Sequence, residues 1–343
     1  MSRIEPTDRG LAGALFTPLS WLYGAGVRAR LALYGAGLLT SEKVEGVRVV
    51  GIGNLTVGGT GKTPVAIMLA SMLEKPAIVS RGYGRASAEP VQVVNDGKGN
   101  VAPYPDAADE ALVCAAALPA VPVICAPRRV EGIRAARGLF GAKTAILDDA
   151  FSHLAAARGK NILLVDALDP FGGEKLLPAG RLREPLSSAR RADAVLITRA
   201  NMADKDTVAG IRLRLAPLLR PDTPVFECAI AAESVVAPSG ETLAADIILG
   251  GAAVTLVSGI AKPEQFEKTV KAFGADVARH HIFADHHRFT DAELEAVTGG
   301  LLLTTQKDAA RMPEKQRRRF HLLTLRAAVR EGAAFAAWLN INN

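Results

Sequence analysis

One stretch constrains the fold more than any other, because an apolar run, a glycine-rich turn and a potential helix follow one another between positions 47 and 74. The run reads VRVVGIG, and NLTVGGTGKTP follows it at 54–64. A glycine-rich turn lets backbone N–H groups approach a polyphosphate, and the positive end of the helix dipole favours the same anion. The general pattern G-x-x-x-x-G-K-[ST] has glycine where this chain has Thr56. The order of elements nevertheless predicts a phosphate loop in preference to a plain glycine-rich turn.

The loop residues differ in what each could contribute. Lys62 is expected to reach the outer phosphates, and the hydroxyl of Thr63 to bind Mg²⁺. Pro64 is tolerated near the start of a helix, where its missing N–H would have no partner in any case. The residues expected to line the nucleotide site are Thr56, Val57, Gly58, Gly59, Thr60, Gly61, Lys62 and Thr63.

Short β-branched runs alternate with amphipathic stretches, a pattern typical of a parallel sheet with helices on both faces. The runs begin near 47, 77, 121, 144, 161 and 194, and helices are expected at 62–74, 107–118, 128–139 and 203–217. A further βαβ-like unit is expected from 254, with a helix over 263–273, and 225–250 is expected to join two domains. We therefore predict an apolar N-terminal segment (1–40), a P-loop α/β domain (41–225) and a smaller C-terminal α/β domain (226–343) that closes over the active site.

The N-terminal segment is unusually apolar, since the seventeen residues from Leu11 to Val27 carry no charge. This length, interrupted by Pro18, is at the short limit for a membrane span, whereas Trp21 and Tyr23 suit a helix lying at the headgroup level. A helix buried in the core is the alternative. The 41 basic residues exceed the 35 acidic ones by 6, which suits phosphorylated substrates or an anionic membrane. Aromatic residues are only 5%, which disfavours a nucleic-acid surface.

An acidic pair, Asp148 and Asp149, ends the run AILDD. Either carboxylate could hold Mg²⁺ beside a phosphate loop, although such a pair can also cap a helix or face solvent in a turn. A GTPase is disfavoured because no lysine is followed two residues later by aspartate. Partitioning-type ATPases are disfavoured because Val57 replaces their signature lysine. A kinase remains, and it needs a base for an acceptor hydroxyl.

Seven further motifs follow the loop in a fixed order over nearly the whole chain. Together they resemble the tetraacyldisaccharide 4′-kinase family, also called the lipid A 4′-kinases, in which the loop has threonine at the position of Thr56. The motifs are GNLTVGGTGKTP at 53–64, SRGYGR at 80–85, ADEALV at 108–113, LDDAFSH at 147–153, LPAGRLREP at 177–185, SGIAKPEQF at 258–266, FADHHRFT at 283–290 and TTQKDAARM at 304–312.

The resemblance implies ATP- and Mg²⁺-dependent phosphorylation of the 4′-hydroxyl of tetraacyldisaccharide 1-phosphate to give lipid IVA, in lipid A biosynthesis. It implies a monomer at the cytoplasmic face of the inner membrane of a Gram-negative-type bacterium, with no nucleic acid as partner. The alternative activity is that of a membrane-associated P-loop ATPase acting as a switch or partner-binding protein. The motifs outside the loop disfavour this alternative.

Individual roles follow from the same resemblance. Asp109 is implied as the general base, with His286 as its hydrogen-bonded partner, while Lys62 and Asp149 act on the phosphates and the metal. Two further pairs are expected near the nucleotide. They are Arg81 and Tyr83, which could form a mobile cover, and Arg183 and Glu184, which could instead be a helix cap and a surface charge.

This chain departs from the usual family pattern at Ala111, Ala150, Ser152 and Gln306. Ala150 matters most, because glycine at that position would permit a positive φ or a close approach to phosphate. We expect the activity to persist, since every charged residue with an implied chemical role is present.

Overall fold

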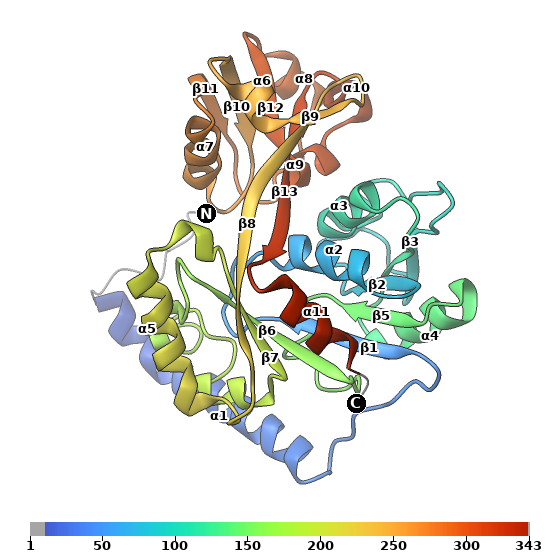
Figure 1. Cartoon of the computed structure of the whole chain (residues 1–343), viewed down its shortest axis with the longest axis vertical. Helices are drawn as coiled ribbons and strands as arrows, with labels where there is room; N and C mark the ends of the chain where they lie inside the picture. The colour runs from blue at the N-terminus through green and yellow to red at the C-terminus, as the bar shows by residue number, and fades with distance from the viewer. Residues whose placement is uncertain (1–10, 342–343) are drawn as a thin grey trace. The chain divides into compact units, whose positions relative to one another are not determined.

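The computed structural model describes residues 11–341, which group into two compact units by their contacts. The first unit contains the chain up to Arg81, Ala126–Ile230 and the chain from Ala327 onward. The second contains Gly82–Cys125 and Ala231–Arg326. Figure 1 labels the elements of both. The boundaries expected near 41 and 226 divide the chain by sequence alone, and they stay a prediction.

A parallel sheet forms the centre of the first unit, with strand order β2-β5-β1-β6-β7-β8 (Figure 1). Strands buried on both faces read as continuous apolar runs, which is why these segments lack polar alternation. β1 pairs with β5 in the register Gly51↔Leu147, so the loops after both strands leave the same edge of the sheet. The strands are β1 (Arg48–Gly53), β2 (Pro76–Ser80), β5 (Thr144–Leu147), β6 (Lys160–Asp166), β7 (Ala194–Thr198) and β8 (Val225–Val236).

Helices pack on this sheet. α5 (Lys205–Leu215) buries Val208, Ile211 and Leu215 in the core formed with β6 and β7. α2 contacts β1, β2 and β5, and α4 contacts β2 and β5. Near the end of the chain, Phe335 and Trp338 of α11 pack against Phe226 of β8. The bounds are α2 (Lys62–Met72), α4 (Arg129–Phe140) and α11 (Gly332–Asn340), with short 3₁₀ turns η1 (Gly172–Glu174), η2 (Leu186–Arg191), η3 (Ala200–Met202) and η4 (Ala216–Leu218).

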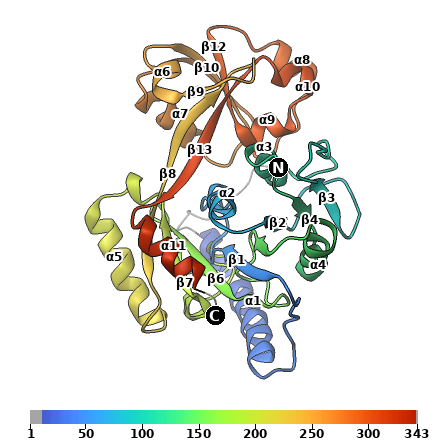
Figure 2. The same cartoon turned by 45° about the vertical axis from the view of Figure 1, so that its right-hand side comes forward.

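The second unit has its own parallel strands in the order β11-β10-β12-β13, of which Figure 2 labels β10, β12 and β13. Leu256 and Val257, adjacent in β10, enter different apolar clusters: the first with α6 and α7, the second with α8. Neighbouring strand residues point to opposite faces, so helices cover both sides of these strands. The elements are β3 (Gln92–Asn95), α3 (Asp109–Ala117), β4 (Val123–Cys125), β9 (Thr242–Ala244), α6 (Ala245–Leu249), β10 (Ala253–Ser258), α7 (Pro263–Ala272), β11 (Asp276–Ile282), α8 (Asp291–Glu295), β12 (Leu301–Thr305), α9 (Gln306–Arg311), α10 (Glu314–Arg317) and β13 (His321–Val329).

The predicted α/β class is confirmed, and strands occur near all six expected starts. Several elements differ from the expectation, and β9, β12 and β13 are among the strands that were not predicted. The stretch expected to join two domains begins with the twelve-residue strand β8, in whose first half buried residues alternate with partly exposed ones because one face meets the core. β3 was not predicted, and it pairs antiparallel with β4.

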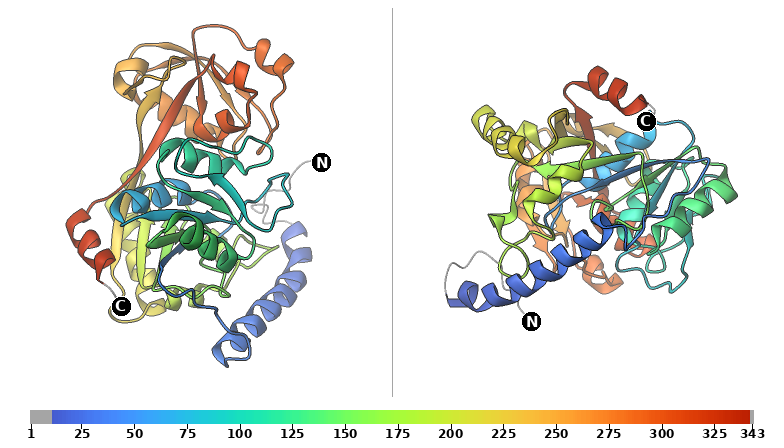
Figure 3. Two further views of the ribbon diagram at one scale, coloured as in Figure 1. Left: turned by 90° about the vertical axis from the view of Figure 1, so that its right-hand side faces the viewer. Right: turned by 90° about the horizontal axis from the view of Figure 1, so that it is seen from below.

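α1 (Leu11–Gly35) lies along one side of the first unit (Figure 3). Its Ser20 hydroxyl donates to Leu176 O over 3.1 Å, and the Tyr23 hydroxyl donates to Arg183 O over 2.8 Å. Trp21 and Leu22 are each 72% exposed, so these side chains do not belong to a core. None of the helices within residues 11–341 combines the length and apolarity needed to cross a bilayer.

Candidate active site

The glycine-rich loop takes the backbone geometry that its glycines permit. Gly58 has φ 118° and Gly61 has φ 80°, a left-handed region that disfavours side chains with a Cβ. Gly61 is the N-cap of α2. A Cβ on Gly61 would lie 2.0 Å from Ile230 Cδ1, whereas one on Gly58 or Gly59 would meet no atom within 4 Å. The loop is therefore fixed on one side by packing and open at Gly58 and Gly59.

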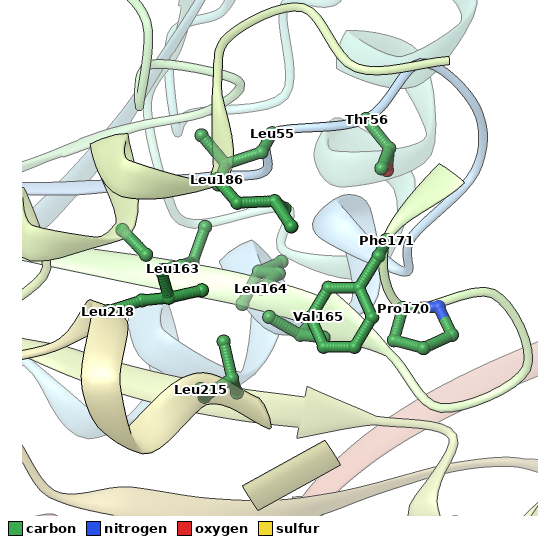
Figure 4. Close-up of a pocket in the computed structure, with 11 residues that line it drawn as sticks. Leu55, Thr56, Leu163, Leu164, Val165, Pro170, Phe171, Leu186, Leu215 and Leu218 are labelled. Atoms are coloured by element: carbon green, nitrogen blue, oxygen red, sulfur yellow. The ribbon is translucent and has the colours of Figure 1, made fainter. Parts of the chain in front are cut away.

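Thr56 occupies the position where the general loop pattern has glycine, and its surroundings explain the difference. It forms an antiparallel bridge with Leu182, flanked by hydrogen bonds from Val57 N to Arg181 O (2.8 Å) and from Arg183 N to Leu55 O (2.7 Å). Its side chain is buried above a cavity of about 10 Å³ among apolar residues (Figure 4). Thr56 is therefore a paired and buried residue, and its side chain helps to line the cavity.

Lys62, Asp149 and Arg183 meet beside the loop. The Lys62 Nζ lies 3.7 Å from Asp149 Oδ1 and 3.4 Å from Asn54 Oδ1. The Arg183 guanidinium contacts both Asp149 oxygens, at 2.9 and 3.0 Å, and donates to Asn54 O over 3.0 Å. Burial acts to raise the pKa of Asp149, but the charges of Lys62 and Arg183 outweigh it and hold that pKa well below its usual range. The cluster keeps this carboxylate ionised.

The acidic pair follows β5, as predicted. Asp148 is buried and its Oδ1 accepts the Asp149 N–H over 2.8 Å. The positive φ in this turn, 49°, belongs to Asp149. Ala150 is fully buried, and its N–H donates to Ile52 O over 2.7 Å at the end of β1. Alanine is therefore accommodated at 150 without the left-handed backbone that would have required glycine.

The other predicted nucleotide residues lie in different surroundings. Thr63 is buried in the first turn of α2, and Thr60 O accepts the Thr198 hydroxyl over 2.9 Å. Glu184 is buried and pairs with Arg191 at 2.6 Å, so the structure does not bring it to the Lys62 cluster as it brings Arg183. Arg81 is exposed, and it is the last residue of the first of the three chain segments that form the first unit.

Sequence reasoning missed two residues that support the loop. Asn54 joins Lys62 and Arg183 through its side-chain oxygen, and Arg199 links Asp166 to the Gly59 carbonyl. Both follow directly on strands of the parallel sheet, at the strand ends where ligand sites of open α/β sheets form. Their position after a strand was a signal that could have identified them.

In the second unit, Asp109 and His286 form the predicted pair. Asp109 is the first residue of α3 and is 6% exposed, and its Oδ2 lies 3.1 Å from His286 Nδ1. Burial acts to raise the pKa of Asp109, but its hydrogen bond to His286 and the nearby cations outweigh this and lower it. The same hydrogen bond is the main cause that raises the pKa of His286. The exposed Tyr83 ring stands edge-on to His286, with 6.4 Å between ring centroids.

Two cations of the motif TTQKDAARM also surround this pair, and neither was assigned a role from the sequence. Arg311 is buried, with its Nε 3.8 Å from Asp109 Oδ2. Lys307 pairs with Glu110 at 2.5 Å and contributes to the lowered pKa of Asp109. Both lie on α9, which packs on α3. Their spacing of four residues places them on one helical face, which was a usable sequence signal.

The loop residues fit a nucleoside triphosphate with Mg²⁺. The face at Gly58 and Gly59 is unobstructed, Lys62 supplies a cation, and Asp148 and Asp149 supply the oxygen ligands that Mg²⁺ prefers. Within residues 11–341, no group of three or more His, Cys, Asp or Glu side chains could hold a metal by itself. This agrees with an ion held by one or two carboxylates together with phosphates.

Comparison with known proteins decides the family. The sequence profile of the family described as Tetraacyldisaccharide-1-P 4'-kinase (LpxK) matches residues 12–342. The chain belongs to this family. The resemblance drawn from the ordered motifs is thereby confirmed.

Individual members of the LpxK family are similar over most of their length. A protein named Tetraacyldisaccharide 4'-kinase from Anaeromyxobacter sp. (strain K) is 40% identical over 313 residues, which cover 88% of this chain and 82% of the relative. One of the same name from Syntrophotalea carbinolica is 37% identical over 311 residues, covering 87% and 83%. The crystal structure of LpxK from Aquifex aeolicus in complex with ATP has a TM-score of 0.80 and 29% identity, covering 96% of this chain and 98% of that one.

Proposed function

We propose that this protein is a tetraacyldisaccharide 4′-kinase, which transfers the γ-phosphoryl group of ATP to the 4′-hydroxyl of tetraacyldisaccharide 1-phosphate and yields lipid IVA. Family membership over residues 12–342 supports the reaction. The observation that carries it is that one chain holds both a glycine-rich phosphate loop and a buried carboxylate that is hydrogen-bonded to an imidazole. The family membership favours the kinase over a switch ATPase.

The first unit is proposed to hold the nucleotide. Backbone N–H groups at Gly58, Gly59 and Gly61 would surround the phosphates, and Lys62 would neutralise the charge that develops on them. Thr63, Asp148 and Asp149 would hold Mg²⁺, which supplies charge neutralisation of the phosphate oxygens when it is bound. Arg183 fixes both oxygens of Asp149 and so sets the direction of that carboxylate before the nucleotide arrives.

The second unit is proposed to activate the acceptor. Asp109 would accept the proton of the 4′-hydroxyl, and His286 would hold its carboxylate in one orientation. A carboxylate with a lowered pKa is a weak base toward a free alcohol, so the proton moves as the bond to phosphorus forms. Closure of the C-terminal domain over the active site, and a nucleotide cover containing Arg81 and Tyr83, are part of this proposal. So is a contact of Glu184 with the nucleotide or acceptor.

Membrane contact at the cytoplasmic face of the inner membrane is also proposed, with the protein acting as a monomer. The acceptor carries four acyl chains, so the enzyme must meet it at a lipid surface. The exposed Trp21 and Leu22 on α1 support such contact, since indole and leucyl side chains favour the interface.

The test is transfer of labelled phosphate from ATP to detergent-dispersed acceptor, with lipid products separated by thin-layer chromatography. We expect label on the acceptor at the 4′ position and little hydrolysis of ATP without acceptor. Hydrolysis that ignores the acceptor, with no labelled lipid, would refute the kinase and support the switch ATPase.

A further inference from the structure

An open groove of about 700 Å³ lies at the C-terminal end of α1 in the first unit. Its lining combines apolar side chains with hydroxyl groups and two guanidinium groups. The residues that matter here are Leu31, Tyr34, Leu39, Ser188, Arg190 and Arg191. The proposed kinase chemistry uses none of them.

The polar part of the groove favours an anion. None of its lining residues is acidic. Arg190 is exposed, and no ion pair joins it to another residue of the described chain, whereas Arg191 is already paired with Glu184. Ser188 is 4% exposed, and its hydroxyl has no hydrogen-bond partner within residues 11–341. Both residues line the groove, and a cation together with a hydroxyl that has no partner suits a phosphate group, which offers charge and several acceptor oxygens.

The apolar part continues onto the protein surface. Leu39 lines the groove and is 40% exposed, and the neighbouring Leu38 is 73% exposed. Leu33 on the last turns of α1 is 41% exposed. A lipid bound by its headgroup in the groove could therefore cover these leucines with its acyl chains, which would remove apolar surface from water.

We propose that this groove binds the phosphate headgroup of an anionic phospholipid of the membrane. The inference rests on the membrane contact proposed above, and it adds a lipid that is not the acceptor. Tyr23, which contacts Arg183, precedes the groove residue Tyr34 by eleven positions on α1. At 1.5 Å per residue the two are roughly 16 Å apart along the helix. Neither Lys62, Asp149 nor Arg183 lines the groove.

Two glycines of α1 allow a matched steric test. A Cβ on Gly35 or on Gly26 would meet no atom within 4 Å, but only Gly35 lines the groove. Gly35→Leu fills the groove without changing charge, and Gly26→Leu adds the same side chain elsewhere on the helix. Arg190→Gln removes the free cation. Arg128→Gln is its control, because that side chain is 75% exposed and lies outside the groove.

Binding of the full chain is measured by co-sedimentation with vesicles of phosphatidylcholine, alone or mixed with phosphatidylglycerol. We expect the wild type to prefer the mixed vesicles, and Gly35→Leu and Arg190→Gln each to lose roughly fivefold in affinity for them. Both control variants should retain it. All four should keep wild-type kcat and KM with detergent-dispersed acceptor.

Other outcomes decide against the groove in different ways. If Gly35→Leu and Gly26→Leu bind the mixed vesicles equally well, the proposed lipid site in the groove is overturned, although membrane contact through α1 would stand. A raised KM for the acceptor in Gly35→Leu, with phosphatidylglycerol binding intact, would assign the groove to the acceptor instead. No binding of the wild type to either vesicle would overturn this inference and the proposed membrane contact together, while phosphate transfer in detergent would still test the kinase.

Discussion

Replacing Gly61 by alanine should destabilise the first unit by an amount that the geometry divides into two parts. The residue has φ 80°, and a left-handed backbone costs an L-residue about 1–2 kcal/mol. The new Cβ would also lie 2.0 Å from Ile230 Cδ1, and overpacking of this kind costs about 1–3 kcal/mol. The expected loss is therefore about 2–5 kcal/mol.

A second substitution separates the two parts. Ile230→Val removes the Cδ1 atom, after which the nearest atoms to the new Cβ are at 3.6 and 3.9 Å, ordinary contact distances. Alone, this change should cost about 0.5–1.5 kcal/mol. Combined with Gly61→Ala it should remove the overlap, so the double variant should be more stable than the sum of the single effects by about 1–3 kcal/mol.

The assay is thermal unfolding of the full chain by calorimetry without nucleotide. Gly59→Ala is the control, because its Cβ would meet nothing within 4 Å and its φ lies outside the left-handed region. Its unfolding temperature should stay close to that of the wild type. Equal effects of the two glycine substitutions would refute the packing argument, and strict additivity of Gly61→Ala with Ile230→Val would refute the assigned clash.

Three further predictions concern the chemistry. Asp109→Asn should lower kcat by about 10²- to 10⁴-fold with an unchanged KM for ATP. A decrease in the steady-state kcat of less than about threefold would rule out its role as base. His286→Ala removes the hydrogen bond that lowers the pKa of Asp109, so the carboxylate should protonate at higher pH. The acid limb of the kcat/KM profile should therefore move to higher pH; an unmoved limb contradicts this. Arg183→Lys cannot keep both contacts to Asp149, so the Mg²⁺ concentration for half-maximal rate should rise roughly 10- to 100-fold. The control Arg214→Lys, at an exposed ion pair, should leave this Mg²⁺ concentration unchanged.

The phosphate loop and the acidic pair could be predicted because their geometry is local. A strand, a glycine turn and a helix are adjacent in sequence, and Asp148 follows a strand that pairs with β1. Even here, the two residues Arg183 and Glu184 were both expected near the nucleotide, but the structure places them in different surroundings. Arg183 joins the Lys62 cluster, whereas Glu184 is turned to Arg191.

Contacts between distant segments could not be derived from periodicity. The grouping of Gly82–Cys125 with the C-terminal strands depends on packing between α3 and α9, about which neither segment alone carries information. Lys307 and Arg311 went unassigned for the same reason, since their relation to Asp109 exists only after that packing. The pairing of Asp109 with His286 was predicted from the family resemblance. A resemblance carries information about contacts between distant segments, whereas hydrophobic periodicity does not.

The separation of Asp109 and His286 by 177 residues has a consequence for how the enzyme is made. At a synthesis rate of about 5–20 residues per second, roughly 9–35 s pass between the two. All the strands that surround the phosphate loop precede position 237 in the chain, so they leave the ribosome before His286 does. The nascent protein therefore contains the phosphate-loop strands well before it contains His286, the proposed partner of the proposed base Asp109. The pair of Asp109 and His286 can form only after the strands around the phosphate loop have been synthesised.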